Sequence, residues 1–181
     1  MTAPRHIVVM GVSGTGKTTI GLAVAERLGG VFVEGDEYHP RSNIEKMASG
    51  TPLDDDDRRP WLQALAAEIA RLDGRGEISV TACSALRRVY RDWLRQGDPD
   101  LFFLHLHTDY DVLLERMEHR EHFMPPSLLQ SQFDTLEMLE ADEWGAVIDD
   151  SLPVEGVVAA SMAELEAAAR EVSDPEAPRG R

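Results

Sequence analysis

The stretch that decides the fold is Gly11-Val12-Ser13-Gly14-Thr15-Gly16-Lys17-Thr18. It fits the pattern G-x-x-x-x-G-K-[ST] and stands between an apolar run at residues 7–10 and a helical stretch that follows Thr18. Glycines in such a loop let successive backbone N–H groups point at phosphate oxygens, and the helix behind them adds its partial positive charge. We therefore expect a nucleoside triphosphate here. Lys17 would reach its β- and γ-phosphates, and the Thr18 hydroxyl would bind Mg²⁺.

Composition limits the partners that the chain can have. Its 181 residues are 43% hydrophobic, enough for one globular domain with a full core. A net charge of −15 disfavours binding to nucleic acid or to an anionic membrane. Cys83 is the only cysteine, so no internal disulfide can form, and no apolar run approaches the ~20 residues that span a bilayer. We expect a cytoplasmic protein without nucleic-acid or membrane partners.

Outward from the loop, short apolar runs alternate with helical patterns. Strands are predicted at residues 7–10, 31–34, 78–83, 101–106 and 146–149, and helices after residue 18 and at 41–48, 62–72, 85–96, 109–119, 127–139 and 154–172. This alternation predicts an α/β fold with three layers, a five-stranded parallel sheet flanked by helices. We expect a single P-loop kinase domain over residues 1–173, with a small lid at roughly 118–137 and a frayed tail at 174–181. Ligands of such a sheet bind beyond the carboxyl ends of its strands.

The position of the acidic residue favours a small-molecule kinase. The third predicted strand ends in Ala82-Cys83-Ser84, so the aspartate that closes a Walker B strand is missing, and no N-K-x-D motif of a GTPase occurs. Asp36 follows the second strand instead, where it would orient a substrate hydroxyl or accept its proton. A helix N-cap without chemistry is the alternative for Asp36.

An anionic ligand of so acidic a protein must meet local cations. Arg116 and Arg120 lie one helical turn apart and suit a lid that brings guanidinium groups onto the transferring phosphate, although ordinary surface ion pairs are the alternative. Arg87 and Arg91 are also one turn apart and would share a helix face. Arg58 either faces the substrate or pairs with the run Asp54–Asp57, which we interpret as a helix start and not as a metal site.

Several blocks of the chain, taken together, resemble the gluconokinase family. They are the loop Gly11–Thr18, Gly35-Asp36-x-x-His39-Pro40-x-x-Asn43-x-x-Lys46-Met47, Pro52-Leu53-x-Asp55-x-Asp57-Arg58-x-Pro60-Trp61-Leu62, Ala82-Cys83-Ser84-Ala85-Leu86-Arg87-x-x-Tyr90-Arg91, His122-Phe123-Met124-Pro125, Leu128-Leu129-x-Ser131-Gln132-Phe133-x-x-Leu136-Glu137 and Pro153-x-Glu155-x-Val157-Val158. Departures from the family are small: Glu34 replaces a frequent aspartate, Arg87 a common lysine and Glu121 a frequent glycine.

The resemblance implies ATP- and Mg²⁺-dependent phosphorylation of D-gluconate at its 6-hydroxyl, which feeds the pentose phosphate or Entner–Doudoroff routes. It implies a fold like that of shikimate and nucleoside monophosphate kinases, commonly as a homodimer. It also implies nucleotide contacts from Gly11, Val12, Ser13, Gly14, Thr15, Gly16, Lys17, Thr18, Thr19, Arg116, Arg120 and Pro153, with Lys17, Asp36 and Arg120 catalytic. The alternatives are a related kinase, such as one for shikimate, or a nucleotide-binding regulator that has lost catalysis.

A sugar acid needs cations for its carboxylate and polar groups for its hydroxyls. The candidate cations are Lys46, Arg58, Arg87 and Arg91, and the candidate polar groups are Asp36, His39, Asn43 and Ser84. Which cation takes the carboxylate stays open at this point.

Overall fold

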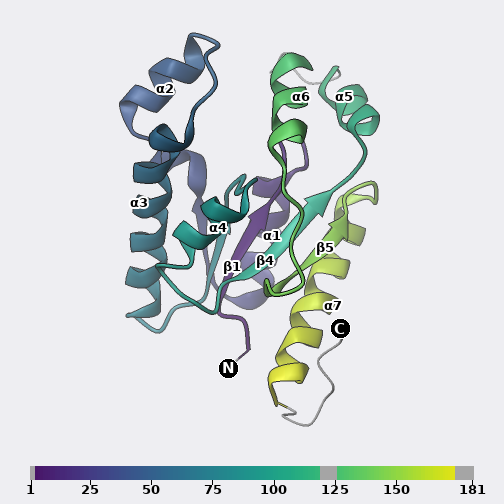
Figure 1. Ribbon diagram of the computed structural model, residues 1–181. Coiled ribbons are helices and arrows are strands. Elements are labelled where there is room, and N and C mark those ends of the chain that lie inside the picture. Colours follow the sequence, from purple (N-terminus) through teal and green to yellow (C-terminus); the bar gives the residue numbers. More distant parts are fainter. Residues whose placement is uncertain (1–2, 119–125, 174–181) are drawn as a thin grey trace.

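The computed structural model describes residues 3–118 and 126–173 and has a parallel sheet at its centre (Figure 1). Its strands within these residues are β1 (His6–Met10), β2 (Val31–Glu34), β3 (Ser79–Ala82), β4 (Phe102–His107) and β5 (Gly145–Asp149). They are arranged in the order β2-β3-β1-β4-β5, and every neighbouring pair is parallel. The residues of the central strands are almost all buried, because helices cover both faces of the sheet. The predicted five-stranded parallel sheet is therefore confirmed.

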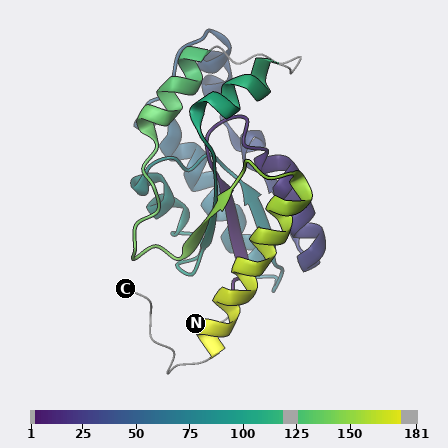
Figure 2. The same cartoon turned by 90° about the vertical axis from the view of Figure 1, so that its right-hand side faces the viewer.

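Two pairs of helices form the outer layers. On one face, α1 (Lys17–Leu28) and α7 (Val154–Ser173) bury a cluster that includes Ile20, Val24 and Val158. On the other face, α3 (Asp55–Asp73) and α4 (Arg88–Leu94) pack on the sheet. The rotated view shows α7 running along the face of the sheet that it covers (Figure 2). No helix in the described part of the chain is both long and apolar enough to cross a membrane.

The remaining short elements follow strand ends at the carboxyl edge of the sheet. They are η1 (Gly35–Tyr38) and α2 (Arg41–Ala48) after β2, and α5 (Tyr110–Glu118) and α6 (Pro126–Thr135) after β4. Figure 1 shows α2 above α3, and α5 and α6 side by side across the sheet from them. Helix α6 forms part of the predicted lid. Residues 119–125 of that lid, and the predicted tail at 174–181, lie outside the described residues.

Two helix boundaries differ from the prediction for clear reasons. Helix α3 begins at Asp55 because a capping box opens it: Asp57 N–H donates to Asp54 Oδ1 and Asp54 N–H to Asp57 Oδ2, each at 2.9 Å. The interpretation of the acidic run as a helix start is thereby confirmed. Helix α4 begins only at Arg88, since Ala85 has a φ of 44° and Arg87 is an extended N-cap. The expectation that Arg87 and Arg91 share a helix face was wrong.

Candidate active site

The phosphate loop is formed by the turn from β1 into α1. Gly11 has a φ of 143°, and a Cβ added there would lie 2.6 Å from the Leu106 carbonyl oxygen, so only glycine fits. Gly14 and Gly16 also have positive φ values, 90° and 75°. The Thr15 hydroxyl and the Lys17 ammonium both donate to the Val12 carbonyl, at 2.9 and 3.1 Å, which closes the loop on itself. This conformation aims backbone N–H groups at a common centre, as an anion site requires.

Carboxylates at the end of β2 and in η1 act on the charge of the Lys17 amine. Burial lowers the pKa of Lys17, while the Asp36 carboxylate is the strongest influence that raises it. The Thr18 hydroxyl donates to Glu34 Oε2 at 2.7 Å. A hydroxyl beside a carboxylate suits Mg²⁺, which binds oxygen ligands. Among residues 3–118 and 126–173 no group of three His, Cys, Asp or Glu side chains could hold a metal, so nucleotide phosphates and water would complete the coordination.

A cavity of about 510 Å³ adjoins the loop on the α7 side. It is lined by Gly14, Thr15, Gly16, Thr19, Ile20, Arg116, Asp150, Leu152, Pro153, Val154 and Val157. Leu152 and Val154 are 43% and 47% exposed and offer an apolar surface to a flat ring. Arg116 donates from Nη1 to Asp150 Oδ2 at 2.8 Å. Arg116 and Pro153, two of the predicted nucleotide ligands, therefore line one cavity with the loop, and their contact with a nucleotide stays a prediction. The same cavity adds Asp150, Leu152 and Val154, whose position after the last strand was the only signal in the sequence.

A second cavity, of about 710 Å³, opens between the start of α3 and the end of α6. Its lining is Leu53, Asp54, Asp55, Asp56, Arg58, Arg87, Tyr90, Asp134, Thr135, Leu136 and Glu137. Arg87 donates from Nη1 to Asp55 at 2.7 Å and from Nε to Glu137 at 3.3 Å. The Arg58 guanidinium donates to the Leu53 carbonyl and lies 5.4 Å from the centre of the Tyr90 ring. Of the four candidate cations that the sequence offered, Arg58 and Arg87 therefore line this cavity.

Asp36 follows a tightly packed glycine and has an exposed carboxylate. Its side chain is 83% exposed, and it lies inside η1, whose N-cap is Glu34, so the N-cap alternative for Asp36 was wrong. Trp61 Nε1 donates to the Gly35 carbonyl at 2.8 Å, and a Cβ on Gly35 would collide with the Ala82 carbonyl. The His39 ring stacks on Trp61 at 3.9 Å, and burial lowers the pKa of His39. The lowered pKa favours the neutral imidazole, whose Nδ1 lies 3.3 Å from Asn43 Nδ2 and whose Nε2 lies 3.9 Å from Asp36 Oδ1.

Two predicted substrate residues are instead structural. Arg91 is fully buried, and its guanidinium is occupied by Glu143 and by backbone carbonyls, so it cannot reach a ligand. Asn43 is 1% exposed and donates to the Asp57 carbonyl at 2.8 Å, which fixes α2 on α3. Both predictions failed because the partners that bury these side chains are distant in sequence.

For the other predicted ligands the structure does not distinguish a binding role from a structural one. Lys46 is 30% exposed and bridges Asp54, at 3.2 Å, and Asp57. Ser84 is partly buried beside the loop, and its carbonyl accepts from the Gly11 N–H at 3.3 Å. Arg120 lies outside the described residues.

A phosphate-binding loop on a 2-3-1-4-5 parallel sheet, with one cavity for a nucleotide and another beside cationic side chains, defines the class of P-loop kinases. The model of a family described as "AAA domain" matches residues 7–124, more than half of the chain. Thermoresistant gluconokinase of Escherichia coli strain K12 is 48% identical over 161 residues, which cover 87% of this chain and 92% of the relative. Gluconokinase of Gluconobacter oxydans is 50% identical over 141 residues, 77% of this chain and 79% of the relative.

Solved structures agree with these relatives. A gluconokinase from Sinorhizobium meliloti 1021 superimposes with a TM-score of 0.89 at 45% identity and covers 97% of this chain and 99% of its own. The chain belongs to the gluconokinase family.

Proposed function

We propose that this protein transfers the γ-phosphoryl group of ATP to the 6-hydroxyl of D-gluconate, yielding ADP and 6-phospho-D-gluconate. The observation that carries the proposal is the second cavity: Arg58 and Arg87 line it, in a protein whose phosphate loop already accounts for the triphosphate. A sugar acid carries a single carboxylate, which the two guanidinium groups would bind. It also carries a row of hydroxyls, which can donate to the acidic side chains of the same lining, Asp54, Asp55, Asp56, Asp134 and Glu137.

The loop and β2 supply the groups for the reaction. Lys17 and the loop N–H groups hold the β- and γ-phosphates, and Thr18, with Glu34 beside it, would hold Mg²⁺, which neutralises developing charge when bound. The 6-hydroxyl oxygen forms a bond to the γ-phosphorus while the bond from that phosphorus to the bridging oxygen breaks. Asp36 orients the hydroxyl and takes its proton. We assign Arg120 to the transferring phosphate on the strength of the family resemblance alone.

For the acceptor, we propose Arg58 and Arg87 as carboxylate ligands. Asp36, His39, Lys46 and Ser84 are the proposed ligands of the hydroxyl groups. A homodimeric assembly and a cytoplasmic location are further proposals. The first comes from the resemblance, and the second comes from the composition of the chain.

The test is a coupled assay that measures the release of ADP from ATP. The acceptors compared are gluconate, other aldonates, shikimate and nucleoside monophosphates. We expect turnover with gluconate well above that with every other acceptor, and its loss in Lys17→Ala, which excludes a contaminating kinase. Activity with shikimate or a nucleotide but none with gluconate would overturn the proposal. ATP binding without turnover on any acceptor would instead indicate a nucleotide-binding regulator.

A further inference from the structure

Gln132, on α6, makes two hydrogen bonds to a residue of the phosphate loop 119 positions away in the sequence. The Ser13 backbone N–H donates to Gln132 Oε1 at 2.6 Å, and Gln132 Nε2 donates to the Ser13 hydroxyl at 3.1 Å. Backbone N–H groups of this loop are the donors that phosphate oxygens accept from. In this structure a side-chain amide therefore occupies a donor of the phosphate site.

Packing holds α6 in place for this contact. Leu129 is fully buried together with Val12 of the loop, Leu86 and Leu113, and Phe133 packs against the same cluster. The helix that carries Gln132 thus packs both against the phosphate loop and against Leu86, the residue before Arg87.

Five residues after Gln132, Glu137 reaches the acceptor cavity. Its backbone N–H donates to the Leu86 carbonyl at 2.7 Å. Its carboxylate accepts from the Arg88 N–H at 2.6 Å and from Arg87 Nε at 3.3 Å. Residues 132–137 therefore contact the donor site at one end and a proposed carboxylate ligand at the other. Asp55 holds the same guanidinium from α3, at 2.7 Å.

We propose that Gln132 is a positioning residue that couples occupancy of the phosphate loop to the acceptor cavity, through Glu137 and Arg87. A phosphate oxygen entering the loop competes with Gln132 Oε1 for the Ser13 N–H. When that bond is released, the segment 132–137 loosens its hold on Leu86 and Arg87. Arg87 keeps its bond from Nη1 to Asp55, and its Nε, which Glu137 held, can bind the carboxylate of the acceptor. A ligand can shift such an equilibrium only because it binds the two states differently, and competition for one donor provides that difference.

The inference rests on the proposed function for the identity of the acceptor, so its first test does not use gluconate. Backbone hydrogen exchange of the 132–140 segment is measured with and without a non-hydrolysable ATP analogue. We expect the analogue to accelerate exchange at the Glu137 amide at least threefold in the unmodified protein. In Gln132→Met, which keeps the side-chain volume but removes both hydrogen bonds, the analogue should cause no change. Gln130→Met is the matched control on the same helix, since Gln130 is exposed and bonds to Asp134, and it should respond like the unmodified protein.

The second test is calorimetric binding of gluconate with and without the same analogue. The unmodified protein should bind gluconate at least threefold more tightly when the analogue is present. Gln132→Met should show the tighter affinity under both conditions, because it lacks the hydrogen bonds that the analogue would release. Glu137→Gln should show the tighter affinity under both, because it weakens the hold on Arg87 directly.

Tighter binding of gluconate without the analogue, in variants at both ends of the segment, separates coupling from simple damage to the fold, which would weaken binding. Glu137→Gln keeps the test open if Gln132→Met does not fold. Unchanged exchange in the unmodified protein, or full coupling in Gln132→Met, would refute the inference even where gluconate is phosphorylated. An exchange response without gluconate binding would refute the proposed acceptor and support the link from Gln132 to Glu137.

Discussion

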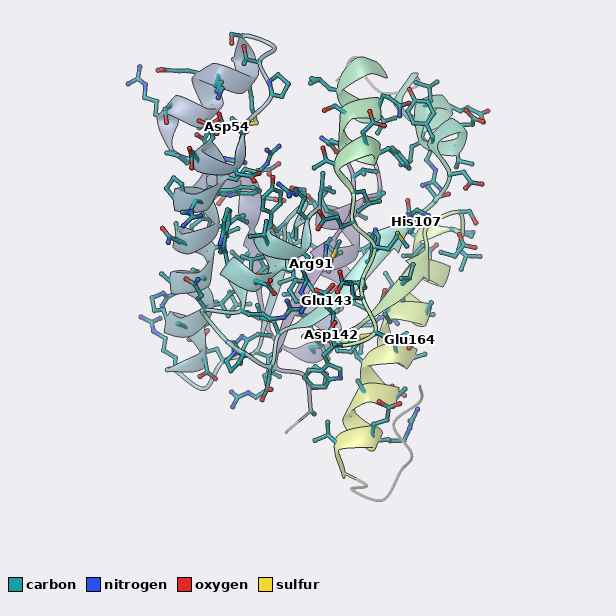
Figure 3. All side chains as sticks on the ribbon, viewed as in Figure 1. Asp54, Arg91, His107, Asp142, Glu143 and Glu164 are labelled. Carbon is teal, nitrogen blue, oxygen red and sulfur yellow. The ribbon has the colours of Figure 1, made fainter. Side chains whose placement is uncertain are left out.

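Arg91 and Glu143 form an ion pair that solvent does not reach. Arg91 Nη2 lies 2.7 Å from Glu143 Oε2 and Arg91 Nε 2.7 Å from Glu143 Oε1, and both side chains are 0% exposed. Figure 3 shows the two side chains meeting between α4 and the segment that precedes β5. Burial would raise the pKa of Glu143, but hydrogen bonds from Arg91, Arg95 and the Glu140 N–H lower it to about 2. The pair holds together the segment that carries Glu137 and the helix after Arg87.

Arg91→Met should therefore destabilise the protein strongly, because it leaves the Glu143 carboxylate buried without its main partner. We expect the free energy of unfolding in urea at pH 7 to fall by about 3–5 kcal/mol. Arg41→Met, which breaks the exposed pair with Glu45, is the control and should leave the urea midpoint unchanged. A loss below about 1 kcal/mol in Arg91→Met would show that the pair contributes little to stability.

Local patterns in the sequence predicted the parts of the site that depend on local structure. The loop from Gly11 to Thr18 needs only its own glycines and the flanking strand and helix, and the place of Asp36 follows from the end of the next strand. Arg91 was misplaced because the positive φ of Ala85 shortens α4, and because Glu143, 52 residues away, buries the guanidinium. The contact of Gln132 with Ser13 spans 119 residues, and no spacing in the sequence indicates it.

The buried ring of His105 should make the folded protein less stable in mild acid. It is 0% exposed, and neither ring nitrogen has a hydrogen-bond partner within residues 3–118 and 126–173. Burial, with smaller effects from His107 and Arg91, lowers the pKa of His105 from 6.5 to about 4. Between these values the unfolded chain binds a proton that the native protein excludes, so stability falls as the pH drops from about 6.5 towards 4, by at most about 3 kcal/mol.

The measurement is the free energy of unfolding at pH 6.5 and pH 5, above the range in which Glu143 begins to protonate in the unfolded chain. His105→Leu should have a smaller slope over this interval than the unmodified protein, and the remaining slope comes from His39, whose pKa burial also lowers. His105→Leu should also be more stable than the unmodified protein at pH 7, because it buries no unpaired polar atom. His107→Gln, at the exposed end of the same strand, should keep most of the slope. Equal slopes in His105→Leu and the unmodified protein would contradict this assignment.

Cys83 should be chemically inert in the folded protein. Its side chain is 1% exposed, and burial raises the pKa of its thiol to about 12. Since the thiolate is the reactive form, iodoacetamide at pH 8 should leave the native protein unlabelled and fully active, whereas the protein in 6 M guanidinium should take up one label per chain. Mass spectrometry of the intact protein makes the comparison. Complete labelling of the native protein within minutes would show that the β3 end opens readily.

The proposed carboxylate ligand Arg87 can be tested separately from the reaction itself. Arg87→Met should raise the KM for gluconate by about 10-fold or more, the effect of losing a charge-assisted hydrogen bond, while the KM for ATP changes little. Arg59→Met is the matched control, since Arg59 lies over the Trp93 ring at 4.6 Å and is absent from the lining of the acceptor cavity. A rise confined to the KM for ATP would place Arg87 at the donor instead.

Asp36 carries the chemical step in the proposed mechanism, and two substitutions distinguish its possible roles. Asparagine still accepts a hydrogen bond from the substrate hydroxyl but cannot take its proton, whereas alanine can do neither. If Asp36 acts as a base, Asp36→Asn and Asp36→Ala should both lower kcat by about 100-fold or more, with the affinity for ATP unchanged. If Asp36 only orients the hydroxyl, Asp36→Asn should retain most of the turnover that Asp36→Ala loses. Glu37→Gln, the next exposed carboxylate in η1, is the control and should match the unmodified protein. Full turnover in Asp36→Ala would remove Asp36 from the reaction altogether.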